Sequence, residues 1–389
     1  MTIQAFINGR VLAGTEPETG FAVLVEDGRI LDVVRDNDPN VAKARRHELN
    51  GALLLPGFID IQVNGGGDVL FNDTPTPEGV RRIAAAHARY GTTGLLPTLI
   101  SDDLAVMRSA VAAVDAAIEQ QVPGILGIHL EGPFLSTQRR GVHDAAKIRA
   151  IDVDGAAVAG SLRRGRTLLT LAPECVEAAL IRQLVARGVI VAAGHTAASY
   201  AQVRAGLDAG IRGFTHLFNA MTPLTSREPG AVGAALDDAA TWCGLIVDGH
   251  HVHPATLRTA IRAKAPGRMI LVTDAMPPVG GDSPGFRLGE QTAVCRDGAC
   301  LTPDGTLAGS CLDMASAVRN SMTMLGLSLG EAVRMASAYP AAFLGLEATH
   351  GRIAPGYRAD LVVADDALTV KQTWIGGIPV YSGSTDARE

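Results

Sequence analysis

Short apolar runs recur through the middle of the chain, and each is long enough for one buried β-strand. Most are separated by stretches with the three-to-four-residue apolar spacing of an amphipathic helix, such as TPEGVRRIAAAHARYG. The runs cover residues 54–63, 93–99, 124–132, 167–174, 189–196, 212–219, 242–249 and 269–276. Their starts are about 31 residues apart on average, the length of a βαβ unit. Eight such units predict an α/β protein, a (β/α)₈ barrel of the TIM type.

The two ends of the chain differ from the middle, because they alternate short extended pieces with glycine-marked turns. The N-terminal pieces are AFINGRVLAG, FAVLVEDGRILDVV and RRHELNGALLL, and the second contains Asp27-Gly28, a dipeptide typical of a tight hairpin. GRIAPGYRADLVVADD and VKQTWIGGIPVYSG continue the pattern at the C-terminal end. We therefore expect residues 1–53 and 349–389 to form one small β-domain beside a barrel of residues 54–348.

Composition and charge restrict the classes of partner. The 389 residues are 47% hydrophobic, which indicates an extensively buried core. A formal net charge of −6 argues against nucleic acid or an anionic membrane as the main partner. The opening MTIQAFINGRVLAG turns polar too soon for a signal peptide, and no apolar run of about 18 residues follows. The sequence predicts a cytoplasmic protein.

The five cysteines give no sign of a shared site. They are odd in number, scattered and without a C-x-x-C pair, so neither a disulfide framework nor a thiolate metal site is indicated. Their positions are Cys175, Cys243, Cys295, Cys300 and Cys311. We expect buried or idle thiols.

Polar side chains follow several predicted strands, at the barrel end that carries active sites. Glu131, His195 and His216 end the third, fifth and sixth strands, so one carboxylate and two imidazoles can converge there. Three such ligands leave a fourth position for water, as in a catalytic zinc-type site. Asp274, after the eighth strand, can face that water as a base. Taken singly, each is more often an ordinary loop residue or helix cap, and only their combination predicts a metal site.

A series of motifs carries a specific resemblance. In chain order they are PGFIDIQVNGGG, PTLI, HLEGPFL, RRGVH, TLAPE, AGHT, THLFNAM, REPGAVGAAL, DGHHVHP, LVTDAM, GTLAGS and AYPAAFLGL…GRIAPGYRADLVV. From about Leu55 to Val363 the chain resembles the N-acetylglucosamine-6-phosphate deacetylases of the amidohydrolase superfamily. The resemblance implies hydrolysis of the acetamide of an N-acetylhexosamine 6-phosphate. It also implies a metal-dependent barrel with a β-sandwich domain built from both chain ends.

The resemblance assigns catalytic roles by motif. Glu131 in HLEGP, His195 in AGHT and His216 in THLFNAM match the metal ligands. Asp274 in LVTDA matches the general base that later protonates the leaving amine. His143 in RRGVH matches the histidine that polarises the acetyl carbonyl, although by itself it reads as a loop histidine. An unactivated amide needs hydroxide, which a divalent cation makes available near neutral pH.

The resemblance also implies a site for the sugar phosphate. Asn219 and the backbone of Ala220 can reach the phosphate, while Arg227 in REPG and His251 in DGHH supply charge-assisted contacts. Without the motif, Arg227 is equally well a solvated loop charge. In this family such groups can come from a neighbouring subunit, so a homodimer is expected.

The segment after the eighth strand, FRLGEQTAVCRDGACLTPDGTLAGS, reads as hairpins that turn at Asp297-Gly298 and Asp304-Gly305. It resembles the part of the family fold that lies beside the substrate. We expect Leu307 and the residues up to Gly309 to contact the sugar through their backbone.

The first barrel strand ends in two amides. Many amidohydrolases carry His-x-His there for a second metal ion, but this chain has Gln62-Val63-Asn64. Amides are weak ligands for a zinc-type ion, so the sequence predicts one divalent cation per chain, with zinc favoured. Gln62 or Asn64 is expected to hydrogen-bond the catalytic water or a neighbouring ligand. The alternative is that both cap the following glycine turn.

Three other functions stay open at this point. The substrate can be N-acetylgalactosamine 6-phosphate, which differs from the gluco sugar by one hydroxyl configuration. A barrel that binds sugar phosphate without catalysis would need neither the three ligands nor Asp274. A cyclic-amide hydrolase or a deaminase would not need Asn219, Arg227 and His251 together.

Overall fold

The central sheet is an eight-stranded parallel barrel, as the sequence predicts. A computed structural model describes residues 2–289, 291–296 and 298–383. The barrel strands follow one another in chain order, each hydrogen-bonded to the next. They are β7 (Phe58–Val63), β10 (Thr92–Ile100), β11 (Gly127–Glu131), β12 (Arg166–Leu171), β13 (Ile190–Ala193), β14 (Gly213–Phe214), β15 (Trp242–Leu245) and β16 (Met269–Leu271). A parallel bridge between Val63 and Ala275 joins the last strand to the first.

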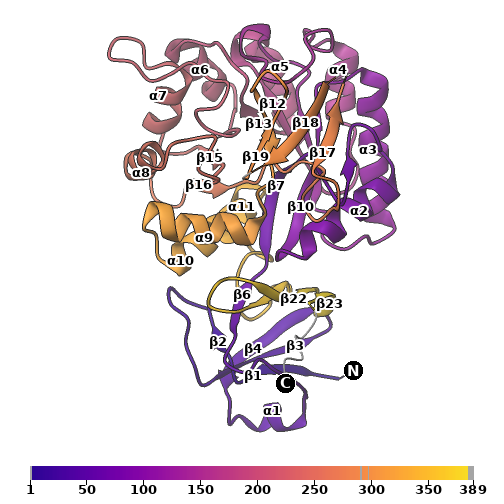
Figure 1. The fold of residues 1–389 in the computed structure, drawn as a ribbon, viewed down its shortest axis with the longest axis vertical. Coiled ribbons are helices and arrows are strands. Elements are labelled where there is room, and N and C mark those ends of the chain that lie inside the picture. Colours follow the sequence, from indigo (N-terminus) through magenta and orange to yellow (C-terminus); the bar gives the residue numbers. More distant parts are fainter. Residues whose placement is uncertain (1, 290, 297, 384–389) are drawn as a thin grey trace. The chain divides into compact units, whose positions relative to one another are not determined.

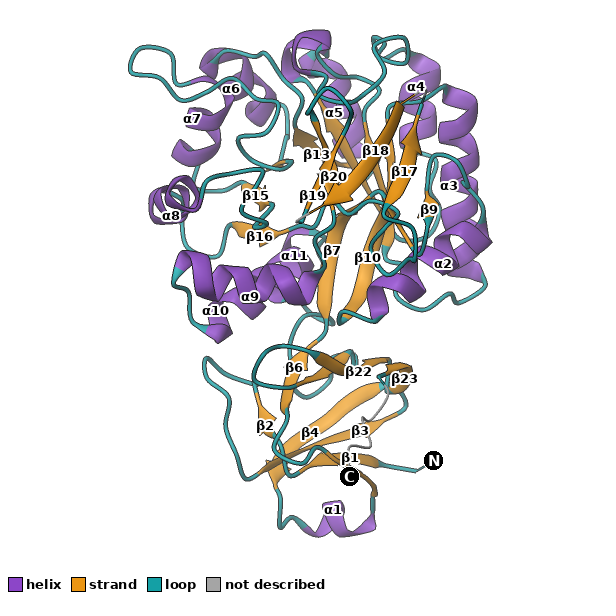
Figure 2. Ribbon diagram, viewed as in Figure 1, coloured by secondary structure: helices purple, strands orange, loops and turns teal. Residues whose placement is uncertain are grey.

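Helices alternate with the strands, and Figure 2 shows them around the barrel. They are α2 (Pro77–Ala88), α3 (Leu104–Glu119), α4 (Val153–Ala159), α5 (Ala178–Ala186), α6 (Tyr200–Asp208), α7 (Gly230–Asp237) and α8 (Pro254–Ala263). Local sequence fixes their starts. The Ser199 side chain accepts the Gln202 backbone N–H while the Gln202 side chain bonds back to Ser199, a capping box that begins α6. Short 3₁₀ turns occur at η1 (Thr137–Arg139) and η2 (Pro173–Cys175).

The chain ends form a β-sandwich, as the family resemblance implies. One sheet has the order β4 (Arg29–Arg35), β3 (Phe21–Glu26), β1 (Gln4–Ile7) and β5 (Arg45–Glu48), and α1 (Pro39–Lys43) lies between β4 and β5 in sequence. The other has the order β2 (Arg10–Val11), β6 (Leu53–Pro56), β21 (Leu361–Ala364), β22 (Val370–Ile375) and β23 (Ile378–Ser382). Phe6, Leu54, Leu361 and Trp374 share one buried core, which joins residues from both ends of the chain.

The expected hairpin at Asp27-Gly28 is confirmed. Both residues have left-handed backbone angles, with φ of 50° and 76°, and their turn pairs Glu26 with Arg29.

The chain divides into two compact units. Residues 1–60, 85–94 and 313–389 form one, which includes α9 (Met314–Leu325), α10 (Leu329–Ala336) and α11 (Ala338–Phe343). Residues 61–84 and 95–312 form the other. The first apolar run, residues 54–63, was expected to be one barrel strand but is two strands. Leu53–Pro56 (β6) belongs to a terminal sheet, and Gly57 separates it from the barrel strand β7. The boundaries at 53/54 and 348/349 stay a prediction.

A small antiparallel sheet follows the last barrel strand, in the region coloured orange in Figure 1. Its strands are β17 (Gly285–Leu288), β18 (Gln291–Arg296), β19 (Ala299–Leu301) and β20 (Leu307–Ser310). The expected turn at Asp304-Gly305 is present, because the Thr302 N–H reaches the Thr306 carbonyl across it. Of the other expected turn, Asp297 lies outside the described residues. A two-stranded ribbon of β8 (Gly65–Gly66) and β9 (Val69–Leu70) follows β7.

The expectation of idle cysteines is wrong for two of the five. Cys295 and Cys300 stand directly opposite each other on β18 and β19 and form a disulfide. The hairpin turn that the sequence predicts at Asp297-Gly298 already places positions 295 and 300 opposite each other, so this pairing could have been predicted from the sequence. Cys175, Cys243 and Cys311 are free thiols.

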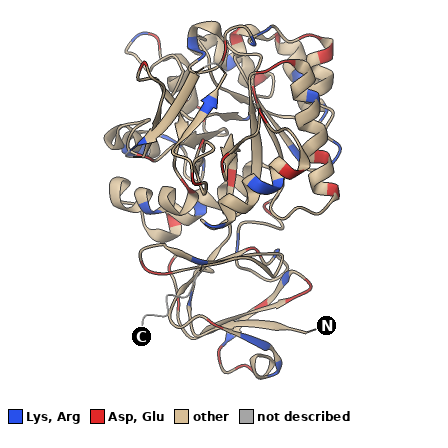
Figure 3. Cartoon of the chain, turned by 45° about the vertical axis from the view of Figure 1, so that its right-hand side comes forward, with Lys and Arg blue, Asp and Glu red and all other residues tan. Residues whose placement is uncertain are grey.

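Charged residues are dispersed over the elements, and Figure 3 shows Lys and Arg interspersed with Asp and Glu. Among the described residues, no helix is both long and apolar enough to cross a membrane.

Candidate active site

The polar strand ends meet in one cavity of about 200 Å³. Most of the residues singled out from the sequence line it. They are Asn64, Glu131, His143, His195, His216, Asn219, Ala220, His251, Asp274 and Leu307. Gln62 is 2% exposed and hydrogen-bonds two of them, Glu131 and Asp274. Residues that are far apart in the sequence are therefore brought together by the barrel, as predicted.

Four of these residues have a strained backbone. His195, His216 and Asp274 follow β13, β14 and β16, and their φ angles are 48°, 33° and 53°. The fourth is Ala220, with φ of 50°. Non-glycine residues seldom adopt this left-handed region, and such strain collects at functional sites, where surrounding contacts hold it. For three of the four it occurs where the chain leaves a barrel strand.

The residues Glu131, His195 and His216 form a compact group of ligand atoms. Glu131 Oε1 lies 3.2 Å from His195 Nε2 and 2.9 Å from His216 Nε2, and the two Nε2 atoms are 3.0 Å apart. The three ligand atoms lie within 4.8 Å of one another, and all three side chains are buried. One carboxylate and two imidazoles in this arrangement suit a divalent cation of the zinc type.

The protonation of the group also fits a cation. His195 Nδ1 is 2.9 Å from the Arg139 carbonyl, to which it donates, so Nε2 keeps its lone pair for a ligand. Burial alone would raise the pKa of Glu131, but the neighbouring imidazoles of His216 and His195 outweigh it and hold the pKa well below its usual value. Glu131 is therefore ionised, as a ligand must be.

The two amides of β7 hold the carboxylates in place. Gln62 Nε2 donates to Glu131 Oε1 at 3.1 Å and to Asp274 Oδ1 at 3.2 Å, so the expected hydrogen bond to a neighbouring group is confirmed. Asn64 Nδ2 donates to the same Asp274 oxygen at 2.6 Å. The side-chain amide of Asn64 thus serves Asp274 rather than the glycine turn.

Asp274 has the protonation expected of a base. Burial and the Glu131 carboxylate raise its pKa to about 6, although His216, His251 and the Asn64 hydrogen bond act in the opposite direction. A carboxyl group with this pKa is ionised at neutral pH and is basic enough to take a proton.

His143 is held as a neutral hydrogen-bond donor. Its Nδ1 accepts the backbone N–H of Ser101 at 3.2 Å and lies 2.8 Å from the Ser101 hydroxyl. The ring proton is therefore on Nε2. Burial and the neighbouring His195 lower the pKa of His143 to about 3, so the ring carries no charge. A neutral imidazole with a fixed N–H can stabilise a developing oxyanion without a change of protonation.

The substrate side of the cavity contains groups suited to an anion. His251 Nδ1 is 2.5 Å from the buried Asp248 carboxylate, which also accepts the His251 backbone N–H. Leu307 and Gly309 line the cavity as expected. Gly309 has φ +63°, and a Cβ there would lie 2.5 Å from the Met276 side chain, so the close approach requires glycine.

Arg227 is not brought into this cavity. It lies on the exposed stretch of residues 223–228 and is not among the residues that line the cavity. Sequence reasoning also missed Ser101, Arg139 and Asp248, which orient His143, His195 and His251. Ser101 and Asp248 come just after β10 and β15, so their position beyond a strand end was the available signal. Arg139 acts through its carbonyl, which no sequence pattern marks.

A parallel barrel whose strand ends bring a carboxylate, two imidazoles and an aspartate together defines a metal-dependent hydrolase. The chain belongs to the amidohydrolase family, whose family model matches residues 53–380. It is therefore a hydrolytic enzyme of that family.

Relatives support this assignment along almost the whole chain. An N-acetylgalactosamine-6-phosphate deacetylase of Shewanella sp. (strain ANA-3) is 46% identical over 92% of this chain and 91% of its own. The human N-acetylglucosamine-6-phosphate deacetylase is 38% identical over 97% of this chain and 95% of its own. The crystal structure of N-acetylglucosamine-6-phosphate deacetylase from Pasteurella multocida has a TM-score of 0.94 at 32% identity, covering 98% of this chain and 100% of that one.

Proposed function

We propose that this enzyme hydrolyses the acetamide of N-acetyl-D-glucosamine 6-phosphate to D-glucosamine 6-phosphate and acetate. The observation that carries the proposal is the convergence of a ligand group, a basic carboxylate and a neutral N–H donor in one cavity. Amide hydrolysis needs all three, because hydroxide must form, the carbonyl must be polarised and the amine must leave protonated.

The proposed cofactor is one divalent cation per chain, with zinc favoured, held by Glu131, His195 and His216. Such a cation supplies Lewis acidity, which lowers the pKa of a water and polarises an amide carbonyl. The amides Gln62 and Asn64 occupy the strand positions that would hold a second cation, and both donate to carboxylate oxygens. An amide can coordinate only through its oxygen, which is a weak ligand for a zinc-type ion, and this supports a single ion.

In the proposed mechanism, Asp274 accepts a proton from the attacking water and later gives it to the nitrogen of the leaving amine. The hydrogen bonds from Gln62 and Asn64 keep its carboxylate aimed at one place. His143 donates its Nε2 proton in a hydrogen bond to the acetyl oxygen, where negative charge develops. Since burial already keeps His143 neutral, this donor is available at every pH of interest.

The proposed phosphate site comprises Asn219, Ala220 and His251 from the cavity wall. Asp248 holds the His251 ring, so its other nitrogen can point to an anion. Arg227 does not line the cavity of its own chain, and we propose that it completes the site of a second subunit in a homodimer. We also propose that the enzyme works in the cytoplasm.

A second candidate substrate is N-acetylgalactosamine 6-phosphate, which the 46% identical Shewanella relative is named for. The test is a comparison of kcat/KM for the two sugars with zinc-reconstituted protein, following acetate and ammonia separately. We expect acetate without ammonia and a higher kcat/KM for the gluco sugar. A higher value for the galacto sugar would replace the first candidate with the second. Ammonia as the product would contradict both.

A further inference from the structure

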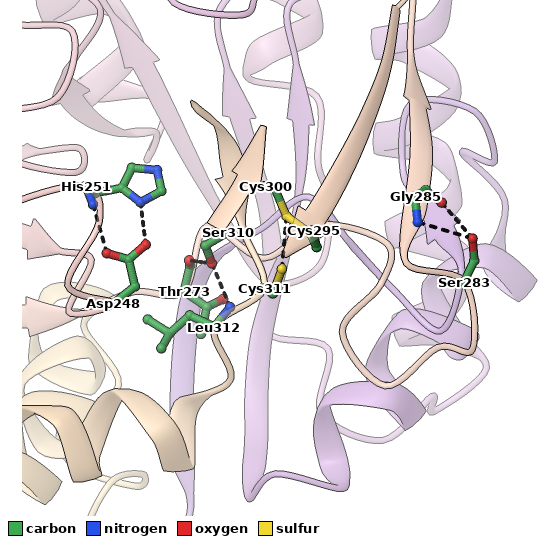
Figure 4. The surroundings of a disulfide bond; sticks show 10 residues. All are labelled: Asp248, His251, Thr273, Ser283, Gly285, Cys295, Cys300, Ser310, Cys311 and Leu312. Carbon is green, nitrogen blue, oxygen red and sulfur yellow. Dashed lines mark hydrogen bonds and ion pairs between the residues drawn. A yellow bond between two sulfur atoms is a disulfide. The ribbon is translucent and has the colours of Figure 1, made fainter. Parts of the chain in front are cut away.

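Three cysteine sulfur atoms lie together in the small sheet that follows the barrel, and Figure 4 shows them side by side. The disulfide joins Cys295 on β18 to Cys300 on β19. The free thiol of Cys311 lies just beyond β20, with its sulfur 3.2 Å from that of Cys300. Cys300 is fully buried, while Cys295 and Cys311 are partly buried.

We propose that these cysteines form a thiol–disulfide exchange site in which Cys300 pairs with either Cys295 or Cys311. In the exchange, Cys311 loses its proton to water, and its thiolate attacks Cys300 Sγ. The Cys300–Cys311 bond forms, the Cys295–Cys300 bond breaks, and Cys295 leaves as a thiolate that takes a proton from water. One disulfide is present before and after, so the exchange needs no oxidant or reductant.

Geometry favours this exchange over a purely structural disulfide. Attack requires the third sulfur to approach one sulfur of the bond, and 3.2 Å is within the distance of a near-attack arrangement. Burial and the Asp248 carboxylate raise the pKa of the Cys311 thiol to about 11. Only a small fraction is therefore thiolate at neutral pH, so the exchange is slow enough for both pairings to be trapped by acid.

The exchange site adjoins the catalytic base through Ser310, the residue before Cys311. The Ser310 N–H donates to the Asp274 carbonyl at 2.9 Å. The Ser310 hydroxyl donates to the Thr273 carbonyl at 2.5 Å (Figure 4). The Met276 N–H donates to the Ser310 carbonyl at 3.0 Å. Ser310 therefore holds the backbone on both sides of Asp274.

Formation of a Cys300–Cys311 bond moves the two side chains toward each other. A disulfide brings two sulfur atoms from 3.2 Å to about 2.05 Å, a shift of about 1 Å. The same sulfur cluster packs with Met276 and Val142, and both of these line the active-site cavity. Because displacements of this size lower the rates of catalysed reactions, we infer that the Cys300–Cys311 form is the less active one.

The first experiment maps the disulfides and needs no substrate. Wild-type protein, Cys295→Ser, Cys311→Ser and the control Cys175→Ser are equilibrated in mixed oxidised and reduced glutathione, quenched with acid and digested for mass spectrometry. Cys175 is an exposed thiol outside the cluster. We expect a Cys300–Cys311 disulfide in Cys295→Ser, a Cys295–Cys300 disulfide in Cys311→Ser, and both pairings in the wild type and the control.

A wild-type map with Cys295–Cys300 alone would overturn the proposal, and this result does not depend on any variant folding. The Tm of each variant shows whether it is folded, and the disulfide maps are compared for variants whose Tm lies within a few degrees of the wild type. A second result would also overturn the proposal. It is that Cys300 and Cys311 stay free thiols in a folded Cys295→Ser protein, under conditions in which Cys311→Ser forms the Cys295–Cys300 disulfide.

The second experiment rests on the proposed function and measures acetate release. For Cys295→Ser, we expect kcat to be at least about fivefold lower in the oxidised than in the reduced form, the lower end of typical coupling between sites. For Cys311→Ser, kcat should differ less between the oxidised and reduced forms, because the Cys295–Cys300 disulfide that this variant can form leaves Ser310 in place. Equal redox responses in the two variants would contradict the link to Asp274. Absence of acetate from every protein, including the reduced wild type, would instead count against the proposed function.

Discussion

Replacement of Asp274 by asparagine tests the proposed base with little change in shape. Asp274 Oδ1 accepts hydrogen bonds from Asn64 at 2.6 Å and from Gln62 at 3.2 Å. The carbonyl oxygen of an asparagine can accept both, so the fold and the ligand group are expected to persist. The substitution removes only the ability to take a proton and the negative charge.

The expected loss follows from that single change. General base catalysis contributes about 10² to 10⁴ in rate, which corresponds to about 2.7 to 5.4 kcal/mol of barrier. Asp274→Asn should therefore lower kcat for acetate release by at least about 10²-fold. The bound cation, measured by elemental analysis, and the substrate affinity, measured by calorimetry, should remain close to the wild-type values.

The pH profile provides the control. Asp274 must be ionised to act, so wild-type activity should fall as the pH falls through its pKa, which burial and Glu131 raise to about 6. A nearby cation favours the carboxylate and lowers this value, so the acidic limb should lie at pH 6 or below. The residual activity of Asp274→Asn should not show this fall in activity at acidic pH. A variant within about threefold of the wild-type rate, with the limb intact, would refute the assignment.

Three further substitutions separate the other roles. His143→Gln should lower kcat by about 10² to 10³ with little change in KM, because the lost hydrogen bond forms mainly in the transition state; an unchanged kcat would place His143 outside the chemistry. Arg227→Ala should raise KM for the 6-phosphorylated sugar much more than for the unphosphorylated sugar, and an equal effect on both would remove Arg227 from the phosphate site. Gln62→Leu should weaken cation binding by about 10- to 100-fold in a chelator titration, since it loses the hydrogen bond to Glu131, and unaltered affinity would argue against that support.

Much of the barrel could be predicted because its strands are short apolar runs at regular spacing, and parallel strands must bring their ends together. Glu131, His195 and His216 were identifiable for the same reason, since each directly ends or follows a predicted strand. The sandwich was predictable as extended structure. The sequence did not show that the first apolar run, residues 54–63, begins inside the sandwich. Only the pairing of β6 (Leu53–Pro56) with β2 and β21 separates that strand from β7.

The features that escaped prediction depend on contacts between distant residues. The tautomer of His143 is set by Ser101, 42 positions earlier, and that of His195 by a carbonyl at Arg139. The approach of Cys311 to the sulfur of Cys300 depends on how the next strand pairs. The sequence does not mark these encounters between separate segments.

The most direct test of the account is the number of cations that the active enzyme needs. Protein stripped with a chelator is titrated with zinc while acetate release from N-acetyl-D-glucosamine 6-phosphate is followed. The donating amides of Gln62 and Asn64 leave one ligand group, formed by Glu131, His195 and His216. The account predicts that activity rises linearly and saturates at one equivalent per chain. Activity that requires two tightly held ions, or that persists with none, would contradict it.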